Sequence, residues 1–286
     1  MFRRREAREL GVVLLGVVAA LGALALVAAG LATTAAVDRR RTADALESLQ
    51  ADALARSAIA TAATLLGEQA RTGEPDTPRA PWAHPFGRQD IGPGWIEVTV
   101  EDEARRLDLN APDVGTAFGR LLRTLGLDPS LADALGDWTD RDDDERPHGA
   151  ERDWYRRHDP PLVPPNAPLA SLGELALMRW GDERTVERLR PFVTVTPEPR
   201  LNPNTAAPEV LEAWLGDPER ARDLVAKRAA GLVDCDDLPP CTTRAQHYLV
   251  RATAGVGRVR RRVEAVVWAV GSEPRVTGWR RLEPLP

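Results

Sequence analysis

An uncharged apolar stretch near the N-terminus decides the fold of this chain. Residues 10–37 read LGVVLLGVVAALGALALVAAGLATTAAV and contain no charged side chain. About 20 apolar residues in a helix are enough to cross a bilayer, so we assign residues 12–37 as a transmembrane helix. Arginines flank this stretch on both sides, at Arg3–Arg5 and Arg39–Arg41, and the positive-inside rule alone therefore does not fix its orientation.

The apolar pattern continues beyond the membrane segment. Apolar residues recur at helical spacing over residues 38–70, among them Leu46, Leu54 and Leu66. A cleaved secretory signal has an apolar core of only about 7–15 residues and no reason to merge into an amphipathic helix. A buried core helix is seldom so long and so free of polar side chains. We expect one helix of roughly 80 Å, whose outer half packs one apolar face on a soluble domain.

Net charge and cysteine count narrow the class of protein. The 286 residues carry a net charge of -5, which argues against binding nucleic acid through a basic surface. Two cysteines, Cys235 and Cys241, could close a small disulfide loop in an oxidising compartment or remain two free thiols. Their C-x5-C spacing is not a zinc-binding spacing.

Two groups of predicted strands enclose a helical block. Alternation of apolar and polar residues predicts a strand at 95–101, with 104–110 as its partner strand, after a loop at 72–88. Near the C-terminus, 246–253 and 257–268 predict a hairpin, and 275–282 a further strand. Six helices are expected between the two groups, at 113–125, 130–139, 172–179, 182–189, 208–214 and 218–230.

The predicted fold class is α+β. One antiparallel sheet, built from residues 90–110 and 244–286, packs on the N-terminal helix. The α-helical domain of residues 111–243 is inserted between its strands. Several of the predicted helices follow a residue able to cap them, namely Asp113, Ser130, Ser171 or Asp182.

A dense acidic segment is the best candidate for a metal site. Counting Asp140 as position one places Asp142, Asp144 and Glu151 at positions three, five and twelve, the carboxylate spacing of an EF-hand calcium loop. Position six is Glu145, where that loop needs glycine, so we expect a calcium-stabilised loop of another kind. The candidate ligands are Asp137, Asp140, Asp142, Asp144 and Glu151.

Two alternatives remain for this acidic segment. It could be a solvated loop whose charge is answered by nearby arginines, or a carboxylate pair for the general acid–base chemistry of a membrane-tethered hydrolase. Nothing else in the sequence builds a substrate site, and H-E-x-x-H, G-x-S-x-G and Walker A motifs are absent from it. We therefore predict a protein with no catalytic residues.

A second motif begins at Arg200. The segment Asn202-Pro203-Asn204-Thr205-Ala206 precedes an apolar helix and is similar to the start of a helix-hairpin-helix module. DNA-binding versions present backbone N–H groups of a glycine hairpin to phosphates. Here the hairpin, residues 215–219, contains Asp217 and Glu219, which would repel a phosphate. We expect the scaffold without nucleic-acid binding; a membrane-anchored DNA-binding protein is the alternative function.

Several motifs in a fixed order carry a family resemblance. A short basic leader ends in Gly11, before an apolar helix, as in prepilins. Further motifs follow in this order: Leu109-Asn110-Ala111, Asp137-Trp138-Thr139-Asp140-x-Asp142, Gly149-Ala150-Glu151-x-x-x-Tyr155, Asn166-x-Pro168-x-x-Ser171-x-x-Glu174-Leu175 and Leu201-Asn202-Pro203-Asn204-Thr205-Ala206. The chain resembles the K-type minor pseudopilins of the type II secretion system, the general secretion pathway protein K family.

The resemblance implies a fold and a processing pathway. The fold is pilin-like, with a large helix-hairpin-helix-like (SAM-like) domain inserted in the sheet. Residues 1–11 would be a leader that prepilin peptidase cleaves between Gly11 and Val12, followed by N-methylation of Val12. The resemblance also implies calcium in the acidic loop.

The resemblance further implies a cellular location and binding partners. The protein would be a single-pass inner-membrane protein with its C-terminal domain in the periplasm. It would act at the pseudopilus tip with the I- and J-type minor pseudopilins, next to the major pseudopilin. Most pseudopilins carry Glu at mature position five, where this chain has Gly16. K-type members typically lack this Glu, since a tip subunit has no subunit above it to pair with.

Overall fold

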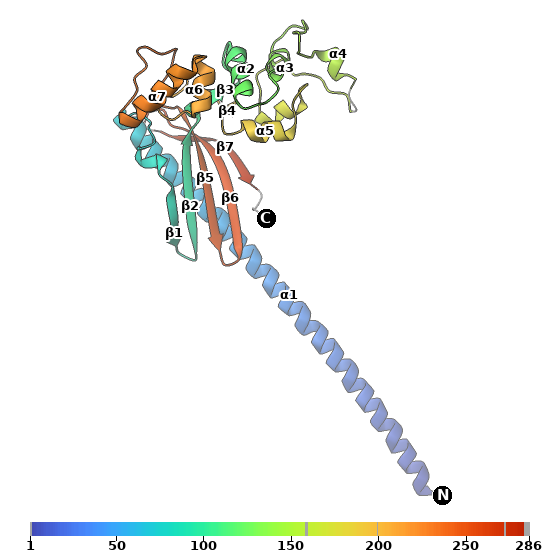
Figure 1. Cartoon of the computed structure of the whole chain (residues 1–286). Helices are drawn as coiled ribbons and strands as arrows, with labels where there is room; N and C mark the ends of the chain where they lie inside the picture. Colours follow the sequence, from blue (N-terminus) through green and yellow to red (C-terminus); the bar gives the residue numbers. More distant parts are fainter. Residues whose placement is uncertain (1, 158–159, 199, 272, 283–286) are drawn as a thin grey trace.

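A single helix forms the stem of the molecule. The computed structural model describes residues 2–157, 160–198, 200–271 and 273–282, and the side chains of its first helix from Val17 onward. That helix, α1 (Phe2–Thr72), runs from the N-terminus into the folded domain (Figure 1). Of the described helices, α1 is the one long and apolar enough to cross a membrane, and its apolar window is 0% buried with a mean hydropathy of 2.1.

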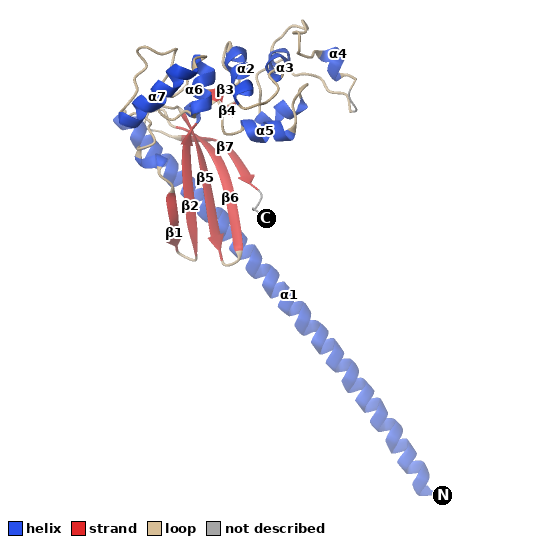
Figure 2. Ribbon diagram, in the orientation of Figure 1, coloured by secondary structure: helices blue, strands red, loops and turns tan. Residues whose placement is uncertain are grey.

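Five antiparallel strands form the main sheet, in the order β1-β2-β5-β6-β7 (Figure 2). Apolar side chains alternate along β2 and β6, so that one face of the sheet packs against α1 and the opposite, open face points away from the helix. The strands are β1 (Phe86–Ile91), β2 (Gly94–Asp102), β5 (His247–Val256), β6 (Val259–Trp268) and β7 (Arg275–Leu282).

Small side chains let the helix lie close to the sheet. Ala55, Ala58 and Ala62 of α1 are buried against the sheet together with Ile59 and Leu66. Burying a side chain such as Ile59, which is 0% exposed, stabilises the fold by about 1.5–3 kcal/mol. Toward the N-terminus, α1 contributes to this core as far as Ala55 and contacts the sheet through polar side chains as far as Glu47, so it leaves the folded domain before it reaches the apolar run.

The predicted partner of the first strand is wrong. Residues 104–110 leave the main sheet: after a 3-10 turn, η2 (Glu103–Arg105), strand β3 (Leu107–Asp108) pairs in parallel with β4 (Val193–Thr194). Leu107 and Leu109 are apolar because they enter the core of the inserted domain. The actual hairpin partner of β2 is β1, which lies partly in the expected loop and which has no apolar alternation because its residues are mostly exposed.

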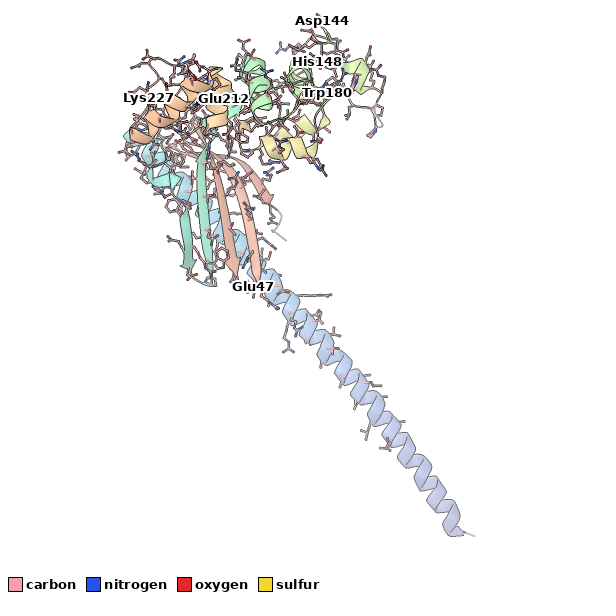
Figure 3. The ribbon with its side chains drawn as sticks, viewed as in Figure 1. Glu47, Asp144, His148, Trp180, Glu212 and Lys227 are labelled. Atoms are coloured by element: carbon pink, nitrogen blue, oxygen red, sulfur yellow. A yellow bond between two sulfur atoms is a disulfide. The ribbon has the colours of Figure 1, made fainter. Side chains whose placement is uncertain are left out.

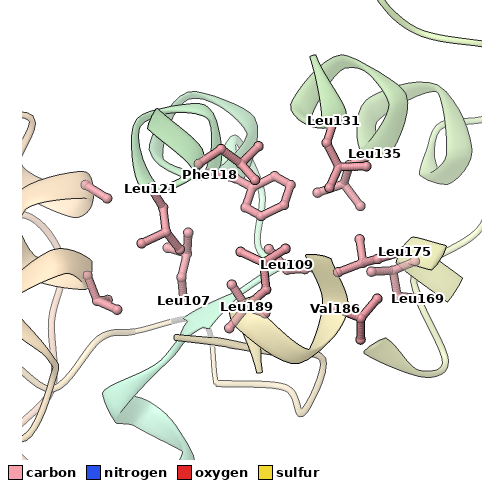
Figure 4. Close-up of a cluster of buried hydrophobic side chains, with 14 of the residues drawn as sticks. Leu107, Leu109, Phe118, Leu121, Leu131, Leu135, Leu169, Leu175, Val186 and Leu189 are labelled. Atoms are coloured by element: carbon pink, nitrogen blue, oxygen red, sulfur yellow. The ribbon is translucent and has the colours of Figure 1, made fainter. Parts of the chain in front are cut away.

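The insertion between β2 and β5 has its own core. Phe118, Leu121, Leu131 and Leu189 are buried around a shared centre (Figure 4). Its helices are α2 (Val114–Thr124), α3 (Leu131–Thr139), α4 (Arg152–Tyr155), α5 (Glu183–Leu189), α6 (Pro208–Leu215) and α7 (Pro218–Ala230), with the 3-10 helix η3 (Leu172–Leu177) before α5. The α+β architecture expected from the sequence is therefore confirmed.

The expected helix caps are only partly formed. Asp182 accepts a hydrogen bond from the Thr185 N–H (2.6 Å) and caps α5. Asp113 and Ser130 form no side-chain cap, and Asp113 adopts a left-handed conformation instead. The predicted helix at 172–179 is the shorter η3.

A buried polar junction joins the two parts. The Asn202 side-chain amide donates to Oδ2 of Asp102 (3.1 Å) and to the backbone oxygen of Asp76 (3.0 Å). The Asp76 carboxylate in turn accepts from the Tyr248 hydroxyl (2.7 Å) and the Ala245 N–H (2.8 Å). Asn202, the first Asn of the Asn-x-Asn motif, thus links the inserted domain to β2 and to the loop that follows α1.

Candidate functional site

Three of the five predicted metal ligands come together at the acidic loop. Helix α3 ends at Thr139, the chain turns outward, and it returns at Glu151 just before α4. One carboxylate oxygen from each of Asp140, Asp142 and Glu151 lies within 4.8 Å of the other two. The sequence spacing therefore translates into a compact oxygen cluster.

The electrostatics of this cluster favour a cation. Glu151 is buried, and neither of its carboxylate oxygens has a hydrogen-bond partner among the described residues; the same holds for Oδ1 of Asp140. Burial, followed by the nearby charges of Asp137 and Asp140, raises the pKa of Glu151 to about 7. Buried carboxylate oxygens without donors are costly unless a bound cation satisfies them, and the all-oxygen donor set is one that calcium accepts.

Asp137 and Asp144 have other roles. Asp137 is fully buried and accepts two hydrogen bonds from Arg146, from its Nη1 (2.6 Å) and from its backbone N–H (3.1 Å). The same guanidinium lies 2.5 Å from Asp140. Asp144 is exposed and donates its N–H to Asp142 (3.1 Å). Arg146 thus neutralises Asp137 and part of the charge on Asp140, whereas Asp142 and Glu151 form no ion pair with any described residue.

The return of the loop depends on residues outside the set of candidate metal ligands. A Cβ at Gly149 would lie 1.8 Å from Oδ2 of Asp137, so only glycine fits there. The Arg179 guanidinium donates to the Gly149 carbonyl (2.8 Å), and the Trp180 indole donates to the His148 carbonyl (2.8 Å). Figure 3 labels Asp144, His148 and Trp180 in this part of the inserted domain. Gly149 beside Glu151 was the only sequence signal for this arrangement.

In the helix-hairpin-helix-like segment, a carboxylate of the chain itself occupies the backbone donors of the hairpin. Helices α6 and α7 meet at Gly216, which has a left-handed conformation, and Asp217 follows. The Asp217 carboxylate accepts from the N–H groups of Glu219 (2.9 Å) and Arg220 (3.1 Å). These are the backbone donors that a DNA-binding hairpin would offer to a phosphate, so their occupation argues against that use.

The two cysteines and the processing residues lie in separate parts of the molecule. Cys235 and Cys241 form a disulfide between α7 and β5, with their Cα atoms 5.7 Å apart. Gly11 and Val12 fall in α1, in the segment whose side chains lie outside the described residues. Cleavage between them therefore stays a prediction.

Comparison with known proteins identifies similar chains. The sequence model of a family described as "Type II secretion system (T2SS), protein K" matches residues 100–198. Over 248 residues the chain is 32% identical to the type II secretion system protein K of Klebsiella pneumoniae, covering 78% of this chain and 76% of that protein. It is 34% identical over 116 residues to the type II secretion system protein K of Dickeya chrysanthemi, covering 37% of this chain and 32% of that protein.

A solved structure has a similar fold. The chain matches one in the crystal structure of the GspK-GspI-GspJ complex from the type 2 secretion system of enterotoxigenic Escherichia coli. The TM-score is 0.72 at 19% identity, and the match covers 85% of this chain and 100% of that chain. At this identity the match shows the fold, a long helix on a sheet with an inserted helical domain.

Proposed function

Because this chain belongs to the type II secretion system protein K family, we propose that it is a minor pseudopilin at the tip of the pseudopilus, where it initiates or caps assembly for protein export. The family is a structural part of a secretion system, so the proposed role is assembly and not catalysis. Its proposed partners are I- and J-type minor pseudopilins, since the related crystal structure is a complex of GspK with GspI and GspJ.

The continuity of α1 carries this proposal. One unbroken helix combines an apolar segment without packing partners and a segment buried against the sheet. In a membrane the first segment is stable because its backbone hydrogen bonds are all internal. Outside the membrane its exposed apolar side chains need the helices of other subunits. Such a helix suits a subunit that waits in the inner membrane, with its folded domain in the periplasm, and then joins a filament.

The inserted domain suits a terminal position. It lies beyond the end of the sheet that is farther from the N-terminus of α1, where a subunit stacked above would have to fit (Figure 1). Gly16 also lacks a carboxylate that could pair with the N-terminus of such a subunit. The disulfide between Cys235 and Cys241 fits an oxidising compartment.

Mass spectrometry of the purified protein tests the assignment. We expect the mature chain to begin at an N-methylated Val12, after removal of residues 1–11 by prepilin peptidase, and to co-purify with its I- and J-type partners. A mature N-terminus at another residue would rule out prepilin processing. Intact processing without co-purification would contradict the proposed partners only.

Calcium is the proposed ligand of the acidic loop. Asp140, Asp142 and Glu151 would hold the ion, which would supply positive charge to their carboxylates and stabilise the loop. The support is the pair of unpartnered, buried oxygens on Glu151. An ion that binds only the folded state raises its stability. The midpoint temperature of thermal unfolding should therefore be higher in calcium than in chelator. Equal midpoints would refute a calcium site.

A further inference from the structure

The open face of the main sheet carries a groove of about 490 Å³ across β1, β2, β5 and β6. Its floor consists of two neighbouring rows of residues that follow from the strand register. One row contains Trp95, Gly255 and Arg260, and the other contains Glu97, Thr253 and Arg262. The intervening residues of these strands, such as Val98 and Ala254, face α1, so both rows point away from the helix.

Trp95 is fixed as an aromatic floor. A Cβ at Gly255 would lie 2.4 Å from the Trp95 indole, so the ring can lie flat over this position only because it is glycine. The guanidinium of Arg88 lies 4.6 Å from the centre of one Trp95 ring, and that of Arg260 lies 5.9 Å from it. Tryptophan and arginine in this arrangement are the residue types that dominate binding energy at protein interfaces.

The groove has an excess of positive charge. Arg88 pairs with Asp90 (3.4 Å), and Arg251 pairs with Glu264 (2.7 Å). In contrast, Arg260 and Arg262 form no ion pair with any described residue. They are two residues apart on one strand, so their side chains share a face at about 7 Å and repel each other. Carboxylates from another molecule would remove this repulsion and could bind each guanidinium in a bidentate manner.

The position of the groove favours a protein over a lipid. On the other side of β6, Arg261 contacts Ser48 (2.6 Å) and Asp52 (3.6 Å) of α1. These residues lie 11 to 15 positions beyond Val37, or about 16–22 Å along the helix. The headgroup layer on each side of a bilayer is only about 5–7 Å thick, so lipid phosphates are out of reach.

We propose that this face of the sheet is a docking site for an acidic segment of a partner protein, with carboxylates on Arg260 and Arg262 and apolar contact on Trp95. That the partner belongs to the secretion assembly rests on the proposed function; the docking site itself does not. The site differs from the helix-to-helix contacts of α1, which are on the opposite face of the sheet.

The lysine content of the chain allows a direct test. Lys227 is its only lysine. In membranes that contain the full-length protein, the variants Arg260→Lys and Arg262→Lys keep the charge and add an amine that a carbodiimide couples to a carboxylate in contact. Mass spectrometry then identifies the acidic residue and its protein. The matched control is Arg123→Lys, at an exposed position of α2.

We expect cross-links from Lys at 260 and 262 to Asp or Glu of a partner, and none above background from Arg123→Lys. Adding Arg262→Glu to Arg260→Lys should lower the yield by roughly tenfold, because a reversed charge repels the partner. High salt should also lower it. Yields equal to the control, or cross-links only to Glu97 of the same chain, would overturn the proposal. Cross-links to an acidic segment outside the secretion assembly would uphold the docking site but count against the proposed function.

Discussion

The buried carboxyl of Asp102 should make the junction between sheet and inserted domain sensitive to pH. Its Oδ2 accepts hydrogen bonds from Thr205 (2.7 Å) and Asn202 (3.1 Å), while Oδ1 has no partner among the described residues. Burial, opposed by the bond from Thr205 and reinforced by the charge of Asp76, raises the pKa of Asp102 from 3.8 to about 7. Arg105 is the nearby cation that opposes this rise.

The sign of the effect follows from proton binding. Between pH 3.8 and about 7 the folded protein holds the Asp102 proton and the unfolded chain has released it. Stability therefore falls as the pH rises through this range and is level above it. Between pH 5 and pH 8 this one group should lower the free energy of unfolding by about 2–3 kcal/mol.

The variant Asp102→Asn tests this reasoning. Its amide oxygen can accept the same two hydrogen bonds but has no proton to lose. The free energy of unfolding is measured by urea titration of a fragment beginning at residue 38, in calcium-free buffer. We expect its decrease between pH 5 and pH 8 to be about 2–3 kcal/mol smaller in the variant than in the wild type. Asp223→Asn, at an exposed site on α7, should keep the wild-type pH dependence. Identical pH dependences for wild type and Asp102→Asn would refute the buried ionisation.

Four further outcomes are expected. Glu151→Gln should abolish the rise in unfolding temperature that calcium gives, while Asp144→Asn, outside the cluster, should retain it. Gly149→Ala should lower the unfolding temperature whether or not calcium is present, because its Cβ would meet the Asp137 carboxylate; an unchanged midpoint would contradict this contact. Phe118→Ala, at a site that is 0% exposed, should cost about 3–5 kcal/mol in urea unfolding, and a cost below 1 kcal/mol would contradict the described core. Cys235→Ala should lower the free energy of unfolding by about 2 kcal/mol, because the disulfide closes a loop whose ends are 6 residues apart and so restricts the unfolded chain. Unchanged stability of the wild-type protein in reductant would contradict the disulfide.

Local signals explain why part of the fold was predictable. The strands β2 and β6 each bury mainly one face, so their apolar alternation is visible in the sequence. Strand β1 is mostly exposed, its sequence has no such alternation, and only its pairing with β2 reveals it. Residues 104–110 showed the opposite problem. Leu107 and Leu109 alternate like a strand of the main sheet but point into a different core.

Local sequence was also insufficient to identify which of the candidate metal ligands lie together. The EF-hand spacing selected four acidic residues, and Asp137 was added from the same acidic segment, because sequence cannot tell which carboxylates lie close together in space. Arg146, nine residues from Asp137, forms an ion pair with its carboxylate, and this pair exists only in the folded loop. Glu151 becomes distinctive only when burial removes its water and its neighbours offer no donor.

The sequence by itself determined the stem, the α+β class and the order of the parts. These features depend on hydrophobic periodicity and on runs of apolar residues, which are properties of neighbouring residues along the chain. The tertiary structure alone decided which carboxylates cluster, how Asp102 is buried at the junction, and that Trp95, Arg260 and Arg262 share one open face. Such features depend on contacts between residues far apart in the chain and on the loss of water around them, and neither is written in local sequence.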